Sequence, residues 1–189
     1  MSSFPLYLLR HGEPEGAGRL IGLTDAPPIA AGIAACADQA RNLAAEVLIA
    51  SDLSRARLAG EAIGLATDVP LSIDPRWREL DFGAWDGMAP GDVEGAALAR
   101  FWDDPDGHAP PGGERWSALV ERVSAAIDDL AARPTLIVTH AGAMRAALAV
   151  LCGFDMHQTW AVDLPYNCLL TLRVWPGATP TAQIAGLYP

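Results

Sequence analysis

Short hydrophobic runs, each closed by polar residues, divide the chain at intervals. The first three span residues 4–9, 47–50 and 135–138. A continuous apolar run that ends in a polar turn is typical of a strand buried on both faces of a parallel sheet. Two later runs, 168–174 and 183–187, are expected to form a further strand and an edge strand.

The segments between these runs have helical character. Residues 33–45 and 53–66 are rich in alanine and free of proline, and residues 116–132 place apolar side chains at helical spacing beside a solvated acidic face. A further helix is expected over 141–151, directly after a strand. Strands that alternate with helices predict an α/β domain of three layers, α/β/α, around a mostly parallel sheet.

Residues 85–113 break this alternation. They are rich in proline, glycine and aspartate around one short predicted helix at 94–102. We interpret this segment, called here the 85–113 excursion, as a lid-like crossing over one face of the sheet. Without an internal repeat or a low-complexity linker, residues 1–189 are expected to form a single domain.

Composition narrows the class of protein. Of 189 residues, 51% are hydrophobic and 19% charged, as in an ordinary globular domain. The 13 basic residues, all arginine, and 23 acidic residues give a net charge of −10, which argues against a nucleic-acid partner. The three cysteines are far apart in the sequence and are expected to be reduced thiols. No run has the form of a signal peptide or a membrane span, so a cytoplasmic protein is expected.

Polar residues follow three of the predicted strands. They are Arg10–Glu13, Ser51–Arg57 and Thr139–Gly142, and a fourth polar segment covers Arg78–Gly87. The carboxyl ends of parallel strands meet at one edge of a sheet, so these side chains are expected to face one crevice. Each signal is weak alone, because an isolated histidine or arginine is more often structural. Their convergence is what indicates a site.

The residue types indicate phosphoryl transfer. Guanidinium groups match phosphate oxygens, and a helix N-terminus adds backbone donors. A neutral imidazole is a nucleophile for phosphorus, and cationic neighbours keep it unprotonated. A nearby carboxyl group could protonate the departing alkoxide. Such a set needs no metal ion and no cofactor, because the arginines neutralise the developing charge.

Four ordered motifs resemble the blocks of the histidine phosphatase superfamily, which has the phosphoglycerate-mutase-like fold. They are Leu-Leu-Arg10-His11-Gly12-Glu13, Ser51-Asp52-Leu53-x-Arg55-Ala56, Glu79-Leu80-x-Phe82-Gly83-x-Trp85-x-Gly87 and Val138-Thr139-His140-x-Gly142-x-x-Arg145. A shorter segment, Gly22-Leu23-Thr24-Asp25, also matches.

The resemblance implies roles for individual residues. His11 would be the phosphorylated nucleophile and Glu79 the proton donor, and His140 would complete the catalytic set. Arg10 and Arg55 would bind the phosphoryl group. The substrate-binding residues would also include Arg57, Gly22 and Thr24, with Arg57 equally able to support the site from outside. Arg145 is expected to brace the helix or the sheet end.

Within the family, Phe101-Trp102-x-Asp104-Pro105 followed by Pro110–Glu114 resembles the α-ribazole phosphatase branch, which acts in cobalamin synthesis. Three functions stay open: hydrolysis of a small-molecule phosphate monoester such as α-ribazole phosphate, a phosphoglycerate mutase or broad-specificity sugar-phosphate phosphatase, and a catalytically silent phosphate-binding or docking module. Pro14 stands where many members have threonine, and no asparagine follows nearby, which disfavours the mutase. A homodimer is one possible assembly.

The tryptophans allow two interpretations. They are expected mainly in core or lid packing, and the alternative is that some line an apolar pocket for the leaving alcohol. The four concerned are Trp77, Trp85, Trp102 and Trp116.

Overall fold

The computed structural model describes residues 2–189 and contains one six-stranded sheet in the order β3-β2-β4-β1-β5-β6. The strands are β1 (Phe4–Arg10), β2 (Val47–Ala50), β3 (Leu71–Ile73), β4 (Thr135–Thr139), β5 (Leu169–Trp175) and β6 (Thr181–Tyr188). The first four run parallel, whereas β5 pairs antiparallel with β1 and β6 pairs antiparallel with β5. The predicted α/β class with a mostly parallel sheet is confirmed.

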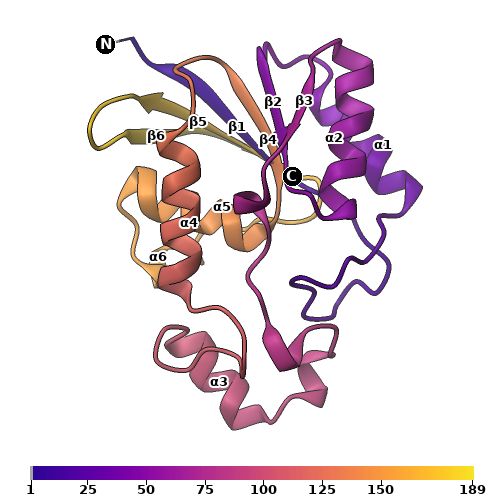
Figure 1. Ribbon diagram of the computed structural model, residues 1–189, viewed down its shortest axis with the longest axis vertical. Coiled ribbons are helices and arrows are strands. Elements are labelled where there is room, and N and C mark those ends of the chain that lie inside the picture. The colour runs from indigo at the N-terminus through magenta and orange to yellow at the C-terminus, as the bar shows by residue number, and fades with distance from the viewer. Residues whose placement is uncertain (1) are drawn as a thin grey trace.

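Helices cover both faces of the sheet (Figure 1). One face carries α1 (Ala30–Ala40) and α2 (Ser54–Thr67), and the other carries α4 (Trp116–Asp128), α5 (Ala141–Cys152) and the short α6 (Met156–Thr159). Each face has its own hydrophobic cluster, with Leu8 and Ile137 on the α4/α5 side and Leu9 and Val138 on the α1/α2 side. Alternate residues of one strand therefore supply the two cores.

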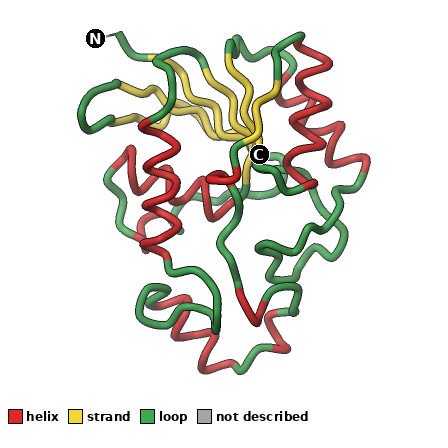
Figure 2. The backbone as a smooth tube through the Cα atoms, in the orientation of Figure 1, coloured by secondary structure: helices red, strands yellow, loops and turns green. Residues whose placement is uncertain are grey.

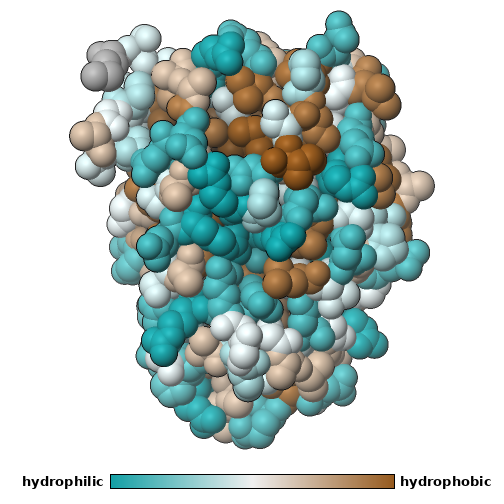
Figure 3. All heavy atoms as spheres, viewed as in Figure 1, coloured by the Kyte–Doolittle hydropathy of each residue, from teal (hydrophilic) through white to brown (hydrophobic). Residues whose placement is uncertain are grey.

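The central strands confirm the prediction of strands that are buried on both faces. All five residues of β4 are buried, and this strand lies between β1 and β2. The predicted edge strand is the outermost strand β6, where Ile184 and Leu187 are exposed. In Figure 3 the visible surface is mostly hydrophilic, and its hydrophobic side chains gather at the upper end, over the strands.

Several boundaries differ from the prediction, most of all those of α1 and α4. Helix α1 begins at Ala30, directly after Pro28 and Ile29, and ends at Ala40, where a turn lets the Leu43 amide donate to the Ala40 carbonyl at 3.0 Å. Helix α4 ends at Asp128 instead of residue 132. Strand β3 was not predicted, because three residues are too few for a periodic signal.

The segment between β3 and α4 extends away from the sheet as mostly irregular chain, shown in green in Figure 2. It contains three single-turn 3₁₀ helices, η1 (Pro75–Trp77), η2 (Gly83–Trp85) and η3 (Pro90–Asp92), and then α3 (Gly95–Asp103). Phe101 of α3 is buried and contacts Phe82 and Trp85 edge-on, with ring centroids 6.0 and 5.8 Å away. These aromatic contacts join the excursion to the hydrophobic cluster on the α4/α5 side of the sheet.

Candidate active site

His11 follows the last residue of β1 and has only 4% of its surface exposed. Its main-chain amide donates to the Thr139 carbonyl at 2.9 Å, and its Nδ1 lies 2.7 Å from the Gly12 carbonyl oxygen. A carbonyl only accepts, so Nδ1 carries the hydrogen and Nε2 keeps its lone pair. Burial, and next the charge of Arg55, hold the pKa of His11 well below 6.5. At neutral pH the ring is therefore a neutral nucleophile.

His140 is the residue before α5 and is fully buried against His11, with ring centroids 4.9 Å apart. Its Nε2 lies 2.9 Å from Oγ of Ser51, which also accepts from the Leu53 amide at 3.4 Å. Among residues 2–189 the Ser51 hydroxyl has no acceptor other than Nε2, so we assign the ring proton to Nδ1. This Nδ1 is buried without a protein partner, which leaves a hydrogen-bond donor for a bound oxygen. Burial, followed by Arg55, lowers the pKa of His140.

Arg10 and Arg55 bring two positive charges to this end of the site. Arg10 donates from Nη1 to the Leu164 carbonyl at 2.6 Å, stacks on Tyr166 with Cζ 4.0 Å from the ring centre, and has a buried, unpartnered Nε. Arg55 is 1% exposed and donates to the carbonyls of Thr24 (2.8 Å) and Gly22 (2.6 Å). Neither guanidinium has a carboxylate within 4.0 Å in the described chain.

Gly22 and Thr24 therefore hold Arg55 through their main chain. Their loop is in turn fixed by Asp86, whose carboxylate accepts from the amides of Gly22, Leu23 and Thr24 at 3.0, 2.6 and 3.0 Å. Gly22 has no room for a side chain, because a Cβ would lie 2.3 Å from the Leu80 carbonyl oxygen. Sequence reasoning missed Asp86, although it lies within the third motif.

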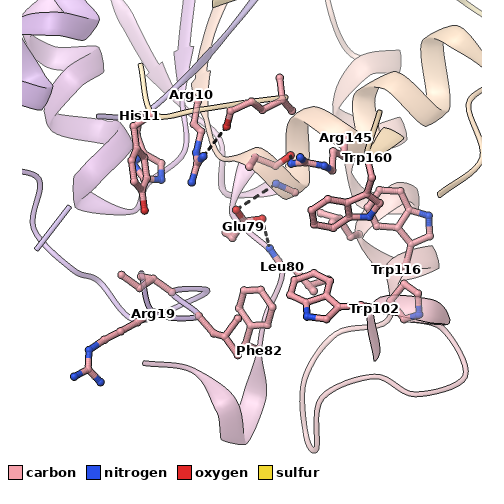
Figure 4. A pocket seen from close by; sticks show the side chains of 18 of the residues that line it. Arg10, His11, Arg19, Glu79, Leu80, Phe82, Trp102, Trp116, Arg145 and Trp160 are labelled. Atoms are coloured by element: carbon pink, nitrogen blue, oxygen red, sulfur yellow. Dashed lines mark hydrogen bonds between the residues drawn. The ribbon is translucent and has the colours of Figure 1, made fainter. Parts of the chain in front are cut away.

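Glu79 follows η1 and enters the pocket from the side opposite His11 (Figure 4). Its Oε1 accepts from the Leu80 amide at 2.9 Å, and its Oε2 accepts from the Gly142 amide at 3.2 Å. A Cβ on Gly142 would lie 2.0 Å from Oε1, so a side chain at this position would displace the Glu79 carboxyl group. The α5 N-terminus thus binds the carboxyl group of Glu79 by its backbone.

Arg122 of α4, a residue that the motifs do not include, holds the chain that carries Glu79. It donates to the carbonyls of Arg76, Arg78 and Glu79 at 2.7, 2.9 and 2.9 Å, and forms a two-pronged ion pair with Glu114 at 2.7 and 2.9 Å. Every side of this guanidinium is occupied by the protein. We interpret Arg122 as a positioning residue.

Of these groups, Arg10, His11, Arg55 and Glu79 line one cavity of about 330 Å³. The others, His140, Gly22, Thr24, Asp86 and Arg122, are not part of its lining. The end near β1 is polar, and the end toward the excursion is aromatic and aliphatic (Figure 4). The apolar lining consists of Leu20, Ile21, Leu80, Phe82, Phe101, Trp102, Trp116, Leu119, Met156 and Trp160.

Not every predicted residue reaches the cavity. Arg57 is half-exposed outside it and pairs with Glu61 at 2.5 Å. Of the tryptophans, Trp102 and Trp116 line the cavity, Trp77 is fully buried in the core, and Trp85 packs against Phe101. Arg145, expected only to brace the helix, lies in the cavity wall.

The arrangement places the neutral imidazole of His11 near two guanidiniums and a carboxyl group. These are the groups that phosphoryl transfer through a phosphohistidine requires. The chain belongs to the histidine phosphatase superfamily (branch 1), whose family model matches residues 6–184. Homologues in this superfamily are phosphatases or mutases, so the chain is classed as a phosphoric monoester hydrolase.

Three individual proteins illustrate the similarity. Glucosyl-3-phosphoglycerate phosphatase of Mycolicibacterium vanbaalenii is 32% identical over 175 residues, which cover 83% of this chain and 77% of that protein. A probable phosphoglycerate mutase of Yersinia pestis is 31% identical over 180 residues, covering 88% and 82%. The crystal structure of α-ribazole phosphatase from Shigella flexneri shares the fold with a TM-score of 0.82 at 24% identity, covering 96% and 95%.

No helix within residues 2–189 is long and apolar enough to cross a membrane.

Proposed function

We propose that this protein hydrolyses small phosphate monoesters through a phosphohistidine, without a metal ion or a cofactor. The proposal is carried by one observation: the free Nε2 of His11 shares a cavity with two guanidiniums that no carboxylate neutralises. A phosphoryl dianion supplies the missing negative charge.

The first step forms a bond between Nε2 of His11 and phosphorus and breaks the bond from phosphorus to the alcohol oxygen. The carboxyl group of Glu79 gives its proton to that oxygen, so the product leaves as a neutral alcohol. Arg10, Arg55 and Nδ1–H of His140 stabilise the charge on the three transferred oxygens.

In the second step a water molecule attacks the phosphohistidine. The carboxylate of Glu79 accepts the proton of this water, the bond from nitrogen to phosphorus breaks, and inorganic phosphate is released. Glu79 is thereby returned to its protonated form and His11 to the neutral ring.

The apolar half of the cavity favours an alcohol with a flat or apolar part. Phe82, Trp102 and Trp116 offer aromatic surface beyond the phosphate end. This agrees with the sequence resemblance to α-ribazole phosphatases, and we propose α-ribazole phosphate as a substrate and the cytoplasm as the site of action. The competing candidates are a broad-specificity sugar-phosphate phosphatase, a phosphoglycerate mutase and a silent phosphate-binding module.

Trapping of the intermediate tests this proposal. Purified protein is incubated with a radiolabelled substrate and quenched in acid or in base, and the label should stay on the protein in base and be lost in acid. His11→Ala should lose the label and more than about 99% of the turnover, whereas His108→Ala, at an exposed position, should keep both.

Three further results test the metal-free mechanism and two of the competing candidates, the silent module and the mutase. Activity should survive a chelator and be inhibited by vanadate; loss in the chelator with recovery on a divalent metal would contradict the arginine-based mechanism. Phosphate binding without turnover of any ester would favour the silent module. Interconversion of 2- and 3-phosphoglycerate without net phosphate release would favour the mutase.

A further inference from the structure

Arg145 lines the cavity but has no role in the proposed mechanism. Its guanidinium is turned toward the cavity interior (Figure 4). Arg145 lies in α5, is 8% exposed, and has a buried Nε without a partner. Its remaining contacts are long, at 3.4 Å from Nη1 to the Ala141 carbonyl and 3.4 Å from Nη2 to the Val162 carbonyl. A buried guanidinium with unspent donors is costly unless a ligand completes it.

The environment of Arg145 repeats that of Arg10. Arg145 stacks on Trp160 with Cζ 4.1 Å from the ring centre, as Arg10 stacks on Tyr166 at 4.0 Å, and both have a buried, unpartnered Nε. Arg122 shows the opposite pattern, because five hydrogen bonds from its guanidinium are satisfied within the protein. The pattern at Arg145 is therefore that of a ligand-binding arginine.

Asp163 supplies an acceptor on the same wall. It lines the cavity with Arg145, is exposed, and has no hydrogen-bond or ion-pair partner in residues 2–189. No ion pair within 4.0 Å joins the two side chains. A donor and an acceptor thus face the cavity separately, beside the indole of Trp160.

The charges divide the cavity into two halves. Arg10 and Arg55 match the two negative charges of a phosphoryl group, whereas the charge of Arg145 is balanced by the carboxylates of Glu79 and Asp163. Arg19 also lines the cavity, but its Nη1 donates to the Gly87 carbonyl at 2.8 Å, and Figure 4 shows its guanidinium directed away from Arg10 and Arg145. A second anionic group on the substrate would therefore lie beside the carboxylate of Asp163 and would have no unpaired cation to bind.

We propose that Arg145 and Asp163 form a polyol subsite, so that the preferred leaving group is an uncharged alcohol with adjacent hydroxyls. A guanidinium only donates and a carboxylate only accepts, whereas a hydroxyl does both. Of two neighbouring hydroxyls, one accepts from Arg145 and the other donates to Asp163. The C–H face of a sugar ring packs on Trp160 and Trp102, whose rings meet edge-on 5.2 Å apart. This inference rests on the proposed function and names its substrate class.

Matched substrates test the subsite. Ribose 5-phosphate has adjacent hydroxyls, and 2-deoxyribose 5-phosphate lacks one of them. The wild type should favour ribose 5-phosphate by about 10- to 100-fold in kcat/KM, the loss expected when a charged donor or acceptor stays unpaired. With the 2-hydroxyl paired to Arg145, Arg145→Met should bring this ratio to within about threefold of one. Asp163→Ala, which loses the contact to the neighbouring hydroxyl present in both sugars, should slow both alike and keep the ratio. Arg173→Met, at an exposed position of β5 outside the cavity, should keep the wild-type ratio.

Binding gives a readout that does not need turnover. Calorimetric titration of His11→Ala with the two sugar phosphates should show the same preference in Kd, again lost on adding Arg145→Met. A wild-type ratio near one, or a ratio unchanged by Arg145→Met, would overturn the subsite. Preference for 3-phosphoglycerate that depends on Arg145 would overturn the uncharged class. If the sugar phosphates bind with the expected ratio and none is hydrolysed, the proposed reaction fails and the subsite stands.

Discussion

The hydroxyl of Ser51 lies 2.9 Å from Nε2 of His140, and our assignment of the ring proton to Nδ1 rests on this contact. Because Oγ of Ser51 also accepts from the Leu53 amide, its own hydrogen is free to go to His140. In the proposed mechanism, the serine that follows β2 thus lets the histidine before α5 donate a hydrogen bond to the phosphoryl group.

Ser51→Ala should therefore lower kcat while leaving His11 intact. Loss of a buried hydrogen bond that leaves its partner unpaired costs about 1–3 kcal/mol, or about 5- to 150-fold in rate. Nitrogen chemical shifts of the His140 ring should show a change of tautomer in the same variant. Ser54→Ala, at the first residue of α2, removes a hydroxyl that donates to the Ala26 carbonyl and serves as the control. A rate loss without a tautomer change would argue against this role.

Glu79→Gln should separate proton transfer from phosphate binding. An alkyl phosphate needs a proton on its leaving oxygen, and the variant should hydrolyse it about 10² to 10⁴ times more slowly. A nitrophenyl phosphate leaves as a stable phenolate, so its loss should be far smaller while phosphorylation of His11 limits the rate. Glu15→Gln is the matched control, because Glu15 is an exposed carboxylate in the loop that follows β1. Burst kinetics are recorded alongside, and equal slowing of both esters without a burst would point to another proton donor.

Gly142→Ala should damage catalysis without damaging the fold. The added Cβ would lie 2.0 Å from Oε1 of Glu79 and displace the carboxyl group. Alanine is a better helix former than glycine by about 1 kcal/mol, so thermal unfolding should occur at or above the wild-type temperature. Gly95→Ala at the start of α3, where nothing lies within 4 Å, should leave the rate unchanged and shift the unfolding temperature in the same direction as Gly142→Ala. Wild-type activity on alkyl phosphates in Gly142→Ala would contradict the close contact.

The buried histidines should make stability depend on pH. Burial, with Arg55 as the next cause, lowers the pKa of His11 and of His140 well below 6.5 in the folded protein. Below about pH 6.5 the two histidines are therefore protonated in the unfolded chain but stay neutral in the folded protein. As the pH is lowered through this range, the free energy of unfolding decreases by up to about 1.4 kcal/mol per pH unit for each histidine. Above that pH this contribution is fully present.

Urea unfolding measured from about pH 8 to about pH 5 checks this expectation. Other carboxylates titrate in the lower part of the range, so the comparison is with His140→Asn, whose curve should be flatter. Parallel curves for the two proteins would mean that His140 titrates normally in the fold.

The motifs sufficed to predict that His11 and His140 lie together, because both residues follow strands whose ends must meet. His11 follows β1 and His140 follows β4, which are paired neighbours in the sheet. The supporting side chains were not predictable in this way. Asp86 and Arg122 act on main-chain groups far away in sequence, and nothing in a local pattern reveals which carbonyl or amide a side chain will reach.

The leaving-group half was hidden for a similar reason. Trp160 and Asp163 lie in the irregular chain after α6, where apolar and acidic residues have no period to interpret. Arg145 was assigned a bracing role because helix position alone does not tell whether a guanidinium is saturated. Only its long contacts and unpartnered Nε distinguish it from Arg122.

The three amides held by Asp86 connect the start of the excursion to the loop that holds Arg55. The start of the excursion, before Met88, is therefore bound to the loop that holds Arg55. Helix α3, which carries Phe101 and Trp102, follows later in the chain. The proposed reaction and part of the aromatic lining are thus carried by separable stretches of chain. A gene segment encoding residues 89–110 could be exchanged between relatives to replace the Phe101 and Trp102 part of the lining, while the groups of the phosphohistidine reaction and the pair Arg145 and Asp163 would be inherited unaltered.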